Sequence, residues 1–246
     1  MRKLALLLFA LLPVGLYAQE KDSAQAIVER YLNMLNYEAL PQDSTLVLET
    51  TISFHGSNDT FSLRRWYATP TMMRIEVWRN DTLTEGLCTN GGGRHRVYSR
   101  REGWWNDAPH HEFHNKMEAY DFRGPLYDWQ LRGIKLSYRG IVTAKGQRLQ
   151  VVRAEQANHF TRYYMFEEQS GLLVLIQEQD EGDSSNDPQV RMLHVKPLDY
   201  KFIHEYLPVG KSLIVSQESF RREGLLTIME TTAHFVPRDN MIFNQD

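Results

Sequence analysis

The spacing of apolar residues changes once along the chain, and the change separates a predicted helix from a long series of predicted strands. Near the start, apolar residues recur at helical spacing, so we predict a helix that Ser23 caps and that ends within residues 36–40, before Pro41. From Leu46 to Phe54 apolar and polar residues alternate instead, which is typical of a half-buried strand. The helical positions are Ala26, Ile27, Tyr31, Met34 and Leu35.

Alternation continues with turn signals between the segments. In the second strand Phe61, Leu63, Arg65 and Tyr67 alternate with their neighbours and therefore share one face. Strands separated by turns every eight to twelve residues or so predict an antiparallel meander. The further predicted strands span residues 73–77, 82–89, 94–100, a segment from 134, 149–154, 160–167, 172–179, 192–206, 213–220 and 225–236.

The middle of the chain has a different pattern. Residues 109–120 predict a helix, with Asp107 as its cap and Pro109 in its first turn. Residues 126–131 predict a second, short helix. The polar stretch at 181–188 predicts an exposed loop.

These elements predict an α+β protein that is mainly antiparallel β. A large meander must bury one face, and two short helices cannot fill a closed barrel of that size. We therefore expect a strongly curved sheet of about eleven strands with the helices lying against its concave side. An apolar cleft between sheet and helices and a completely filled core both remain open at this point.

The first residues predict export. Arg2 and Lys3 precede the apolar run 4–16, and small and then polar residues follow, which is the order of a cleaved signal peptide. That run is shorter than the roughly 20 residues needed to span a bilayer. We expect residues 1–18 to be removed and residues 19–246 to form a single domain in a soluble, periplasmic product.

Composition narrows the classes of function. The full chain carries 28 basic and 31 acidic residues; without Arg2 and Lys3, 26 basic residues face 31 acidic ones, a net charge of −5. That balance argues against a nucleic-acid binder, which needs a basic surface. Cys88 is the single cysteine, so no intrachain disulfide can form, and its strand-like surroundings predict a small buried side chain.

Several short stretches, in this order, resemble one family. They are Ile27-Val28-Glu29-Arg30-Tyr31-Leu32 with Leu35, Pro70 with Arg74-Ile75-Glu76, Asp121-Phe122-Arg123-Gly124-Pro125-Leu126-Tyr127-Asp128-Trp129, Tyr163-Tyr164-Met165-Phe166 followed by Gln169-Ser170-Gly171-Leu172-Leu173-Val174, and Asn240-Met241-Ile242-Phe243. Together they resemble the LolA-like proteins, carriers of outer-membrane lipoproteins, and the related lipoprotein-sorting proteins. The chain departs from the dedicated carriers in two ways. It ends soon after Phe243, and no arginine of this sequence aligns with the one that their lid uses to close over the cavity.

The resemblance implies an unclosed β-barrel with a helical lid over a hydrophobic cavity, and a carrier without enzymatic activity or cofactor. Its ligands would be acyl chains of a lipid or lipoprotein in a hydrophobic cavity, for outer-membrane sorting, with a membrane donor complex and an outer-membrane acceptor as further partners. A monomer is expected. The alternative is a sensor or interaction module of the same fold that binds an envelope protein. Cavity-lining positions chosen from the alternation are Leu48, Ile52, Phe54, Leu63, Ile75, Val77, Leu136 and Tyr138 from the sheet and Phe113, Met117, Tyr120 and Leu126 from the lid.

One cluster has the composition of a metal site. His110 and His114 are four apart on the predicted helix, with His111 between them, and imidazoles at that spacing can bind zinc. A solvated helix face explains the same residues, and we predict no metal. A metal-dependent hydrolase would depend on this cluster alone.

Trp104 and Trp105 are adjacent on a strand and must therefore point to opposite faces.

Overall fold

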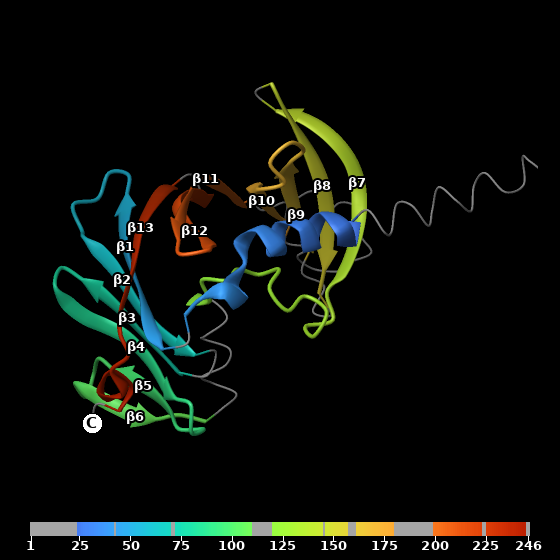
Figure 1. The fold of residues 1–246 in the computed structure, drawn as a ribbon. Coiled ribbons are helices and arrows are strands. Elements are labelled where there is room, and N and C mark those ends of the chain that lie inside the picture. The colour runs from blue at the N-terminus through green and yellow to red at the C-terminus, as the bar shows by residue number, and fades with distance from the viewer. Residues whose placement is uncertain are drawn as a thin grey trace, which may run out of the picture. The chain divides into compact units, whose positions relative to one another are not determined.

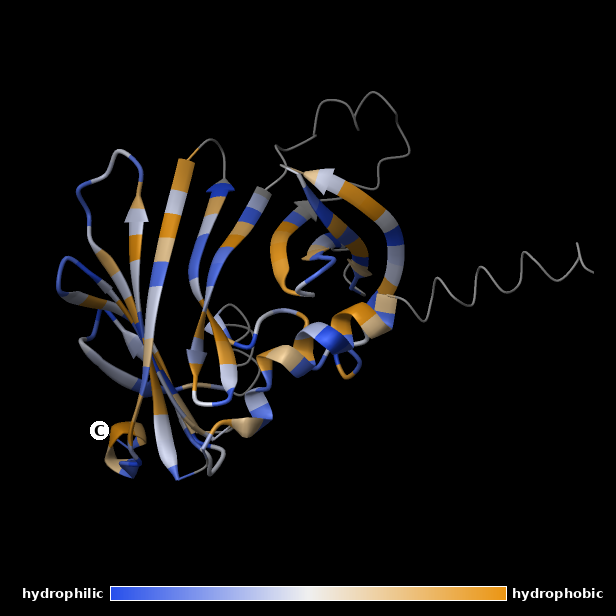
Figure 2. Ribbon diagram, turned by 45° about the horizontal axis from the view of Figure 1, so that its top comes forward, coloured by the Kyte–Doolittle hydropathy of each residue, from blue (hydrophilic) through white to orange (hydrophobic). Residues whose placement is uncertain are grey.

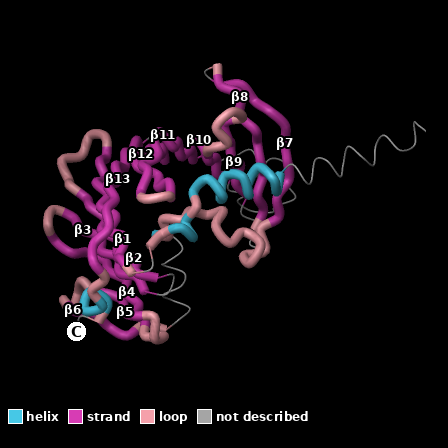
Figure 3. Tube along the Cα trace, viewed as in Figure 1, coloured by secondary structure: helices cyan, strands magenta, loops and turns pink. Residues whose placement is uncertain are grey.

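The computed structural model describes residues 24–41, 43–69, 72–109, 120–144, 146–156, 161–179, 199–222 and 225–244. Strands dominate these residues, with a helix at residues 24–35 and two 3-10 helices, η1 (Tyr37–Ala39) and η2 (Asn240–Phe243) (Figures 1 and 3). The strands are β1 (Ser44–Phe54), β2 (Phe61–Thr69), β3 (Met72–Arg79), β4 (Thr82–Asn90), β5 (His95–Ser99), β6 (Trp104–Asp107), β7 (Lys135–Ala144), β8 (Gln147–Glu155), β9 (Thr161–Glu167), β10 (Leu173–Gln179), β11 (Asp199–Val209), β12 (Ser212–Arg222) and β13 (Leu225–Pro237).

All thirteen strands belong to one sheet in the order β6-β5-β4-β3-β2-β1-β13-β12-β11-β10-β9-β8-β7. The strand pairs whose register is defined are antiparallel, from β1 with β2 to β8 with β9. The order begins at β6 and ends at β7, so the sheet formed by the described strands is open, as the alternating pattern predicts. The sequence undercounted the strands because β6 is short and follows β5 after a tight turn at Gly103, whose φ is 77°.

Two compact units make up the chain, one of Met1–Met34 with Asp128–Phe202 and the other of Leu35–Tyr127 with Ile203–Asp246. The prediction of a single domain over residues 19–246 stays a prediction.

In the first unit the helix packs on one face of β8 and β9. Tyr31 meets Phe166 edge to face, with ring centroids 5.4 Å apart, and Val28 is completely buried. On that face Val152 pairs with Tyr164, and both are buried, so the apolar side of the helix has a matching apolar strand surface. The helix at residues 24–35 is amphipathic, and Figure 2 shows both hydrophobic and hydrophilic residues along it.

β7 extends this face and bends along its length (Figure 1). Leu136 pairs with Ala154 and Tyr138 with Val152, which places both predicted positions on the face that carries the helix. The register then shifts between Tyr138 and Ile141, where Gly140 has a φ of 97°. Such a bulge turns the strand and changes its twist.

The first predicted helix is confirmed, and the short second one is wrong. The helix ends at residue 35 because Asn36 takes a left-handed φ of 50°, and the Ser212 hydroxyl donates to the Asn36 carbonyl at 2.7 Å. Residues 126–133 form turns instead of a helix, since Gly124 and Asp128 both have positive φ. The signal peptide lies outside the described residues, as does the predicted helix at 109–120 apart from its two ends.

Candidate functional site

Strand register in the second unit defines two faces of the β1–β5 sheet. Leu63 on β2 lies opposite Val77 on β3, and Ile75 lies opposite Leu87 on β4. Leu63, Ile75 and Leu87 form a buried cluster with Met73. We call the face that carries this cluster the apolar face.

Around the buried cluster, the apolar face continues in side chains that are only partly buried. Ile52, Val77 and Val97 pack against the cluster from β1, β3 and β5. Tyr67 and Tyr120 also pack against it. The apolar face thus spans five adjacent strands and is incompletely enclosed at these positions.

The predicted cavity-lining residues fall into four groups. Five of them come together on the apolar face: Ile52, Leu63, Ile75, Val77 and Tyr120. Leu48 and Phe54 lie on the same face by register, opposite Arg65 and Thr227, and Leu126 is buried within this unit. Leu136 and Tyr138 belong to the first unit, and Phe113 and Met117 lie outside the described residues. That any of these residues lines a cavity stays a prediction.

Residues 120–127 run over one end of the apolar face. The Tyr67 hydroxyl donates to the Tyr120 carbonyl at 3.1 Å, and the Tyr67 and Phe122 rings lie 4.5 Å apart. The Tyr120 hydroxyl donates to Glu85 on β4 at 2.8 Å. Burial raises the pKa of Tyr67 to about 12, so this hydroxyl stays protonated and keeps donating at neutral pH.

Internal contacts hold this segment in shape. Asp121 accepts two hydrogen bonds from the Arg123 guanidinium, at 2.9 and 2.8 Å, and Arg123 stacks on the Tyr127 ring at 4.1 Å. Tyr37 packs against Phe122 with ring centroids 5.1 Å apart. The segment that carries the family resemblance is therefore a fixed cover over the Tyr67 end of the apolar face.

The opposite face of the same strands is covered by the C-terminal 3-10 helix, and we call it the η2 face. Phe243 of η2 packs into a buried cluster with Ala68, Met72 and Cys88. Asp239 caps η2 by accepting a hydrogen bond from the Met241 amide at 2.9 Å. Trp66, Trp105 and Ile242 pack around this cluster.

A buried ion pair lies beneath η2. Arg74 Nε donates to Glu76 at 2.7 Å, and its Nη1 donates to the Ile242 carbonyl at 3.0 Å. The guanidinium also lies over the Trp105 ring at 4.9 Å. Trp78 Nε1 donates to the second Glu76 oxygen at 3.1 Å, so hydrogen bonds and a ring compensate both buried charges.

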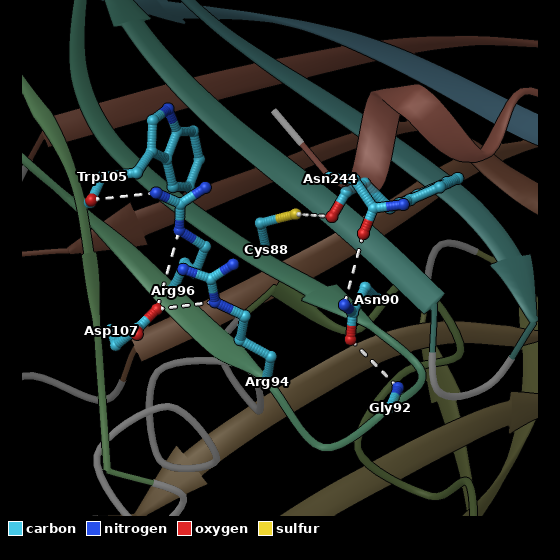
Figure 4. A network of polar contacts seen from close by, with 9 residues as sticks. Cys88, Asn90, Gly92, Arg94, Arg96, Trp105, Asp107 and Asn244 are labelled. Atoms are coloured by element: carbon cyan, nitrogen blue, oxygen red, sulfur yellow. Dashed lines mark hydrogen bonds and ion pairs between the residues drawn. The ribbon is translucent and has the colours of Figure 1, made fainter. Parts of the chain in front are cut away.

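Cys88 belongs to this closed arrangement, as predicted for a small buried residue. Its thiol donates to the Phe243 carbonyl at 3.4 Å, and burial raises its pKa to about 11 (Figure 4). Nearby, Asn90 donates to Asn244 at 3.2 Å, which fastens the residue after η2 to the end of β4 (Figure 4). A neutral, shielded thiol is unsuited to redox chemistry.

The two tryptophans of β6 point to opposite faces, as predicted. Trp105 lies under Arg74 on the η2 face and packs on Tyr98 at 5.8 Å between ring centroids. Trp104 is 60% exposed. Its Nε1 donates to Asn106 at 3.0 Å.

A short polar strip, formed by Arg65, Thr50 and Thr231, crosses the apolar face. Arg65 Nη2 donates to the Thr50 hydroxyl at 2.9 Å, and Thr50 shares a hydrogen bond of 2.8 Å with Thr231 on β13. Alternation along β2 places Arg65 on the face of Leu63 and Tyr67 but does not indicate a role for it. A charged residue at an inward position of an alternating strand was the available signal.

In the described part of the chain, no group of three or more histidine, cysteine or acidic side chains could hold a metal ion. His110, His111 and His114 lie outside the described residues. No helix among the described residues is long and apolar enough to cross a membrane.

The sequence matches no protein-family model and no curated protein. Solved structures share its fold. A DUF1329 family protein from Desulfovibrio piger has a TM-score of 0.59 at 12% identity, and the match covers 90% of this chain and 97% of that protein. A LolA superfamily protein from Nitrosomonas europaea has a TM-score of 0.56 at 8% identity, and the match covers 89% of this chain and 96% of that protein.

A third similar structure is a domain described as an outer membrane lipoprotein-sorting protein, from Vibrio parahaemolyticus. It has a TM-score of 0.53 at 9% identity and covers 89% of this chain and 97% of its own. At these identities the likeness establishes the fold alone. The protein therefore has the fold of LolA superfamily proteins, as its short sequence stretches predicted.

Proposed function

We propose that this protein is an exported carrier that binds acyl chains of a lipid or lipoprotein against the apolar face, in the bacterial periplasm, without enzymatic activity. The proposal joins three supports: the export signal expected at residues 1–18, the LolA-like fold and the chemistry of the apolar face. Ligands of solved structures at this identity do not transfer by similarity. Support for ligand binding must therefore come from the chemistry of the apolar face.

The observation that carries it is the incomplete burial of Ile52, Val77 and Val97 around the Leu63–Ile75 cluster. On the η2 face Phe243 covers the buried cluster of Ala68, Met72 and Cys88. On the apolar face these aliphatic side chains around the buried cluster are only partly buried. Apolar side chains that stay partly exposed together on one face favour a ligand or partner that covers them.

Acyl chains suit such a surface. Each methylene removed from water contributes about 0.8 kcal/mol, so a chain of ordinary length gains enough from contact with aliphatic side chains to remain bound. The aliphatic and aromatic side chains impose no fixed direction of hydrogen bonding, so chains of different length and unsaturation could be accepted.

Native mass spectrometry of the mature protein purified from its own envelope, followed by organic extraction, tests the proposal. A bound lipid or acylated peptide is expected. Ile52→Asn should lower the bound fraction several-fold, because it places an amide on the apolar face. Thr51→Asn is the matched control, since Thr51 is exposed and points to the opposite face.

A protein that carries no lipid, and instead copurifies with one stoichiometric envelope protein, would contradict the carrier and favour the interaction module. Equal lipid content in the Ile52→Asn and Thr51→Asn variants would place the lipid elsewhere. Thermal unfolding of both variants separates loss of ligand from loss of fold.

A further inference from the structure

The apolar face carries a cation that is incompletely compensated. Arg65 on β2 lies opposite Leu48 on β1 and Ile75 on β3, and both of these residues are completely buried. Among the residues that the structure describes, the Arg65 side chain hydrogen-bonds to Thr50 alone. Its Nε is buried and has no hydrogen-bond partner in the described part of the chain.

Neighbouring carboxylates do not neutralise this cation. Among the described residues, none forms an ion pair with Arg65. Glu85, on β4 of the same face, accepts the Tyr120 hydroxyl, and Asp121 is held by both arms of Arg123. Both of these carboxylates therefore already have donors.

A buried donor without an acceptor is unfavourable, and a guanidinium prefers a planar anion that accepts two parallel hydrogen bonds. Carboxylates and phosphates have that geometry. Thr50 and Thr231 add hydroxyl groups beside the guanidinium, so the polar strip offers both charge and further hydrogen bonds within an apolar surface.

We propose that Arg65, with Thr50 and Thr231, binds the anionic group of an acyl-chain amphiphile, a carboxylate or a phosphate, while the chain lies on the apolar face. This inference rests on the proposed function and adds to it a preference for anionic over neutral ligands. The single charge then fixes which end of the ligand lies at the polar strip.

The test compares two ligands with the same chain, oleate and oleyl alcohol, in binding to the full mature protein. The affinity of wild type for oleate should be at least about tenfold higher than for oleyl alcohol, as expected for one charge-assisted contact. Arg65→Met should remove this preference and leave oleyl alcohol binding within about twofold of wild type. Arg65→Lys, which keeps the charge but loses the planar fork, should retain part of it.

Arg64→Met is the matched control, because Arg64 is the neighbouring residue on the opposite face and pairs there with Glu49 at 3.5 Å. It should bind both ligands as wild type does. Thermal unfolding of each variant shows whether the fold is intact, and Arg65→Lys keeps the test decisive if Arg65→Met unfolds.

Further ligands identify the source of the anion. Tighter binding of oleoyl lysophosphatidic acid than of oleate would assign a phosphate headgroup, and the reverse a carboxylate. Inorganic phosphate that displaces oleate completely would overturn the inference in favour of a free-ion site. Equal affinity of wild type for oleate and oleyl alcohol would also overturn it, while leaving the carrier intact. Failure of wild type to bind either would overturn the carrier and this inference together.

Discussion

Arg65 and Arg74 lie on adjacent strands and on opposite faces of the same sheet, and their surroundings differ. Arg74 is only 8% exposed and is compensated by Glu76, by the Ile242 carbonyl and by the Trp105 ring. Within the described ranges, Arg65 has one neutral hydroxyl as acceptor, and its buried Nε has no acceptor.

The difference separates a structural arginine from a candidate binding arginine. Bringing a charge out of water is costly, and a protein that uses the charge only for stability surrounds it with partners, as around Arg74. An arginine left short of acceptors, as Arg65 is, contributes little to stability in the unliganded state. A contribution to ligand binding would explain its presence on the apolar face.

The largest expected effect is at Arg74. Arg74→Met removes the partner of Glu76, which is 6% exposed, and should lower the free energy of unfolding by about 3–5 kcal/mol. Urea denaturation measures this loss. The double variant Arg74→Met, Glu76→Leu should recover much of the stability. A loss below about 1 kcal/mol would show that the pair does not hold the η2 face together.

Removing the side chain that closes the η2 face should cost slightly less. Phe243→Ala leaves a void beside Cys88 and should lower the free energy of unfolding by about 3 kcal/mol, the low end for a buried phenylalanine, because a terminal segment can detach. Met241→Ala is the control: Met241 is 75% exposed, and its change should stay within about 0.5 kcal/mol. Equal effects of the two substitutions would mean that η2 is not docked.

A close approach at Gly86 tests the Trp105 contact. A methyl group added at Gly86 would overlap the Trp105 ring, which lies under Arg74. Gly86→Ala should therefore lower the free energy of unfolding by about 2 kcal/mol and shift the tryptophan emission. An unchanged emission with full stability would show that Trp105 has room to move and is not needed beneath the guanidinium.

The two faces should also differ in how they respond to alkaline pH. Burial raises the pKa of Cys88 from 9.0 to about 11, so its stabilising effect is complete below pH 9 and is lost as pH rises through the folded-state value. The loss at Cys88 should stay below about 3 kcal/mol. Cys88→Ala should flatten the stability profile between these values, whereas Arg65→Met should leave that part of the profile unchanged. Identical profiles for Cys88→Ala and wild type would contradict the assignment.

The smallest effect on stability is expected at Arg65. Arg65→Met should change the free energy of unfolding by less than about 1 kcal/mol in either direction, because the lost hydrogen bond is offset by removal of a poorly compensated charge. Chemical denaturation without ligand measures it. A loss as large as that of Arg74→Met would give Arg65 a structural role and remove the contrast between the two faces.

Local alternation was enough to predict much of this arrangement. The pattern of Phe61, Leu63, Arg65 and Tyr67 placed these residues on one face, and the register with β1 and β3 confirms it. The first helix and its end before Pro41 were also predictable, since period and capping are local properties.

Long-range contacts account for what the sequence did not reveal. Arg74 and Glu76 alternate with Ile75 as polar residues of an exposed face would, yet they are buried because η2, more than 160 residues later, covers them. Alternation also gives no phase between strands, so the common face of Ile52 and Val77 required the register. The turns at residues 126–133 were mistaken for a helix because apolar spacing alone does not reveal a positive φ at Asp128.

Photo-crosslinking with a diazirine-bearing fatty acid, followed by peptide mapping, tests the central claim most directly. The account predicts label on side chains of the apolar face, such as Ile52, Val77 and Val97, with loss of label in Arg65→Met. Two results would contradict the account. One is label confined to residues of the η2 face, such as Trp66 and Ile242, and the other is label that excess oleate does not reduce.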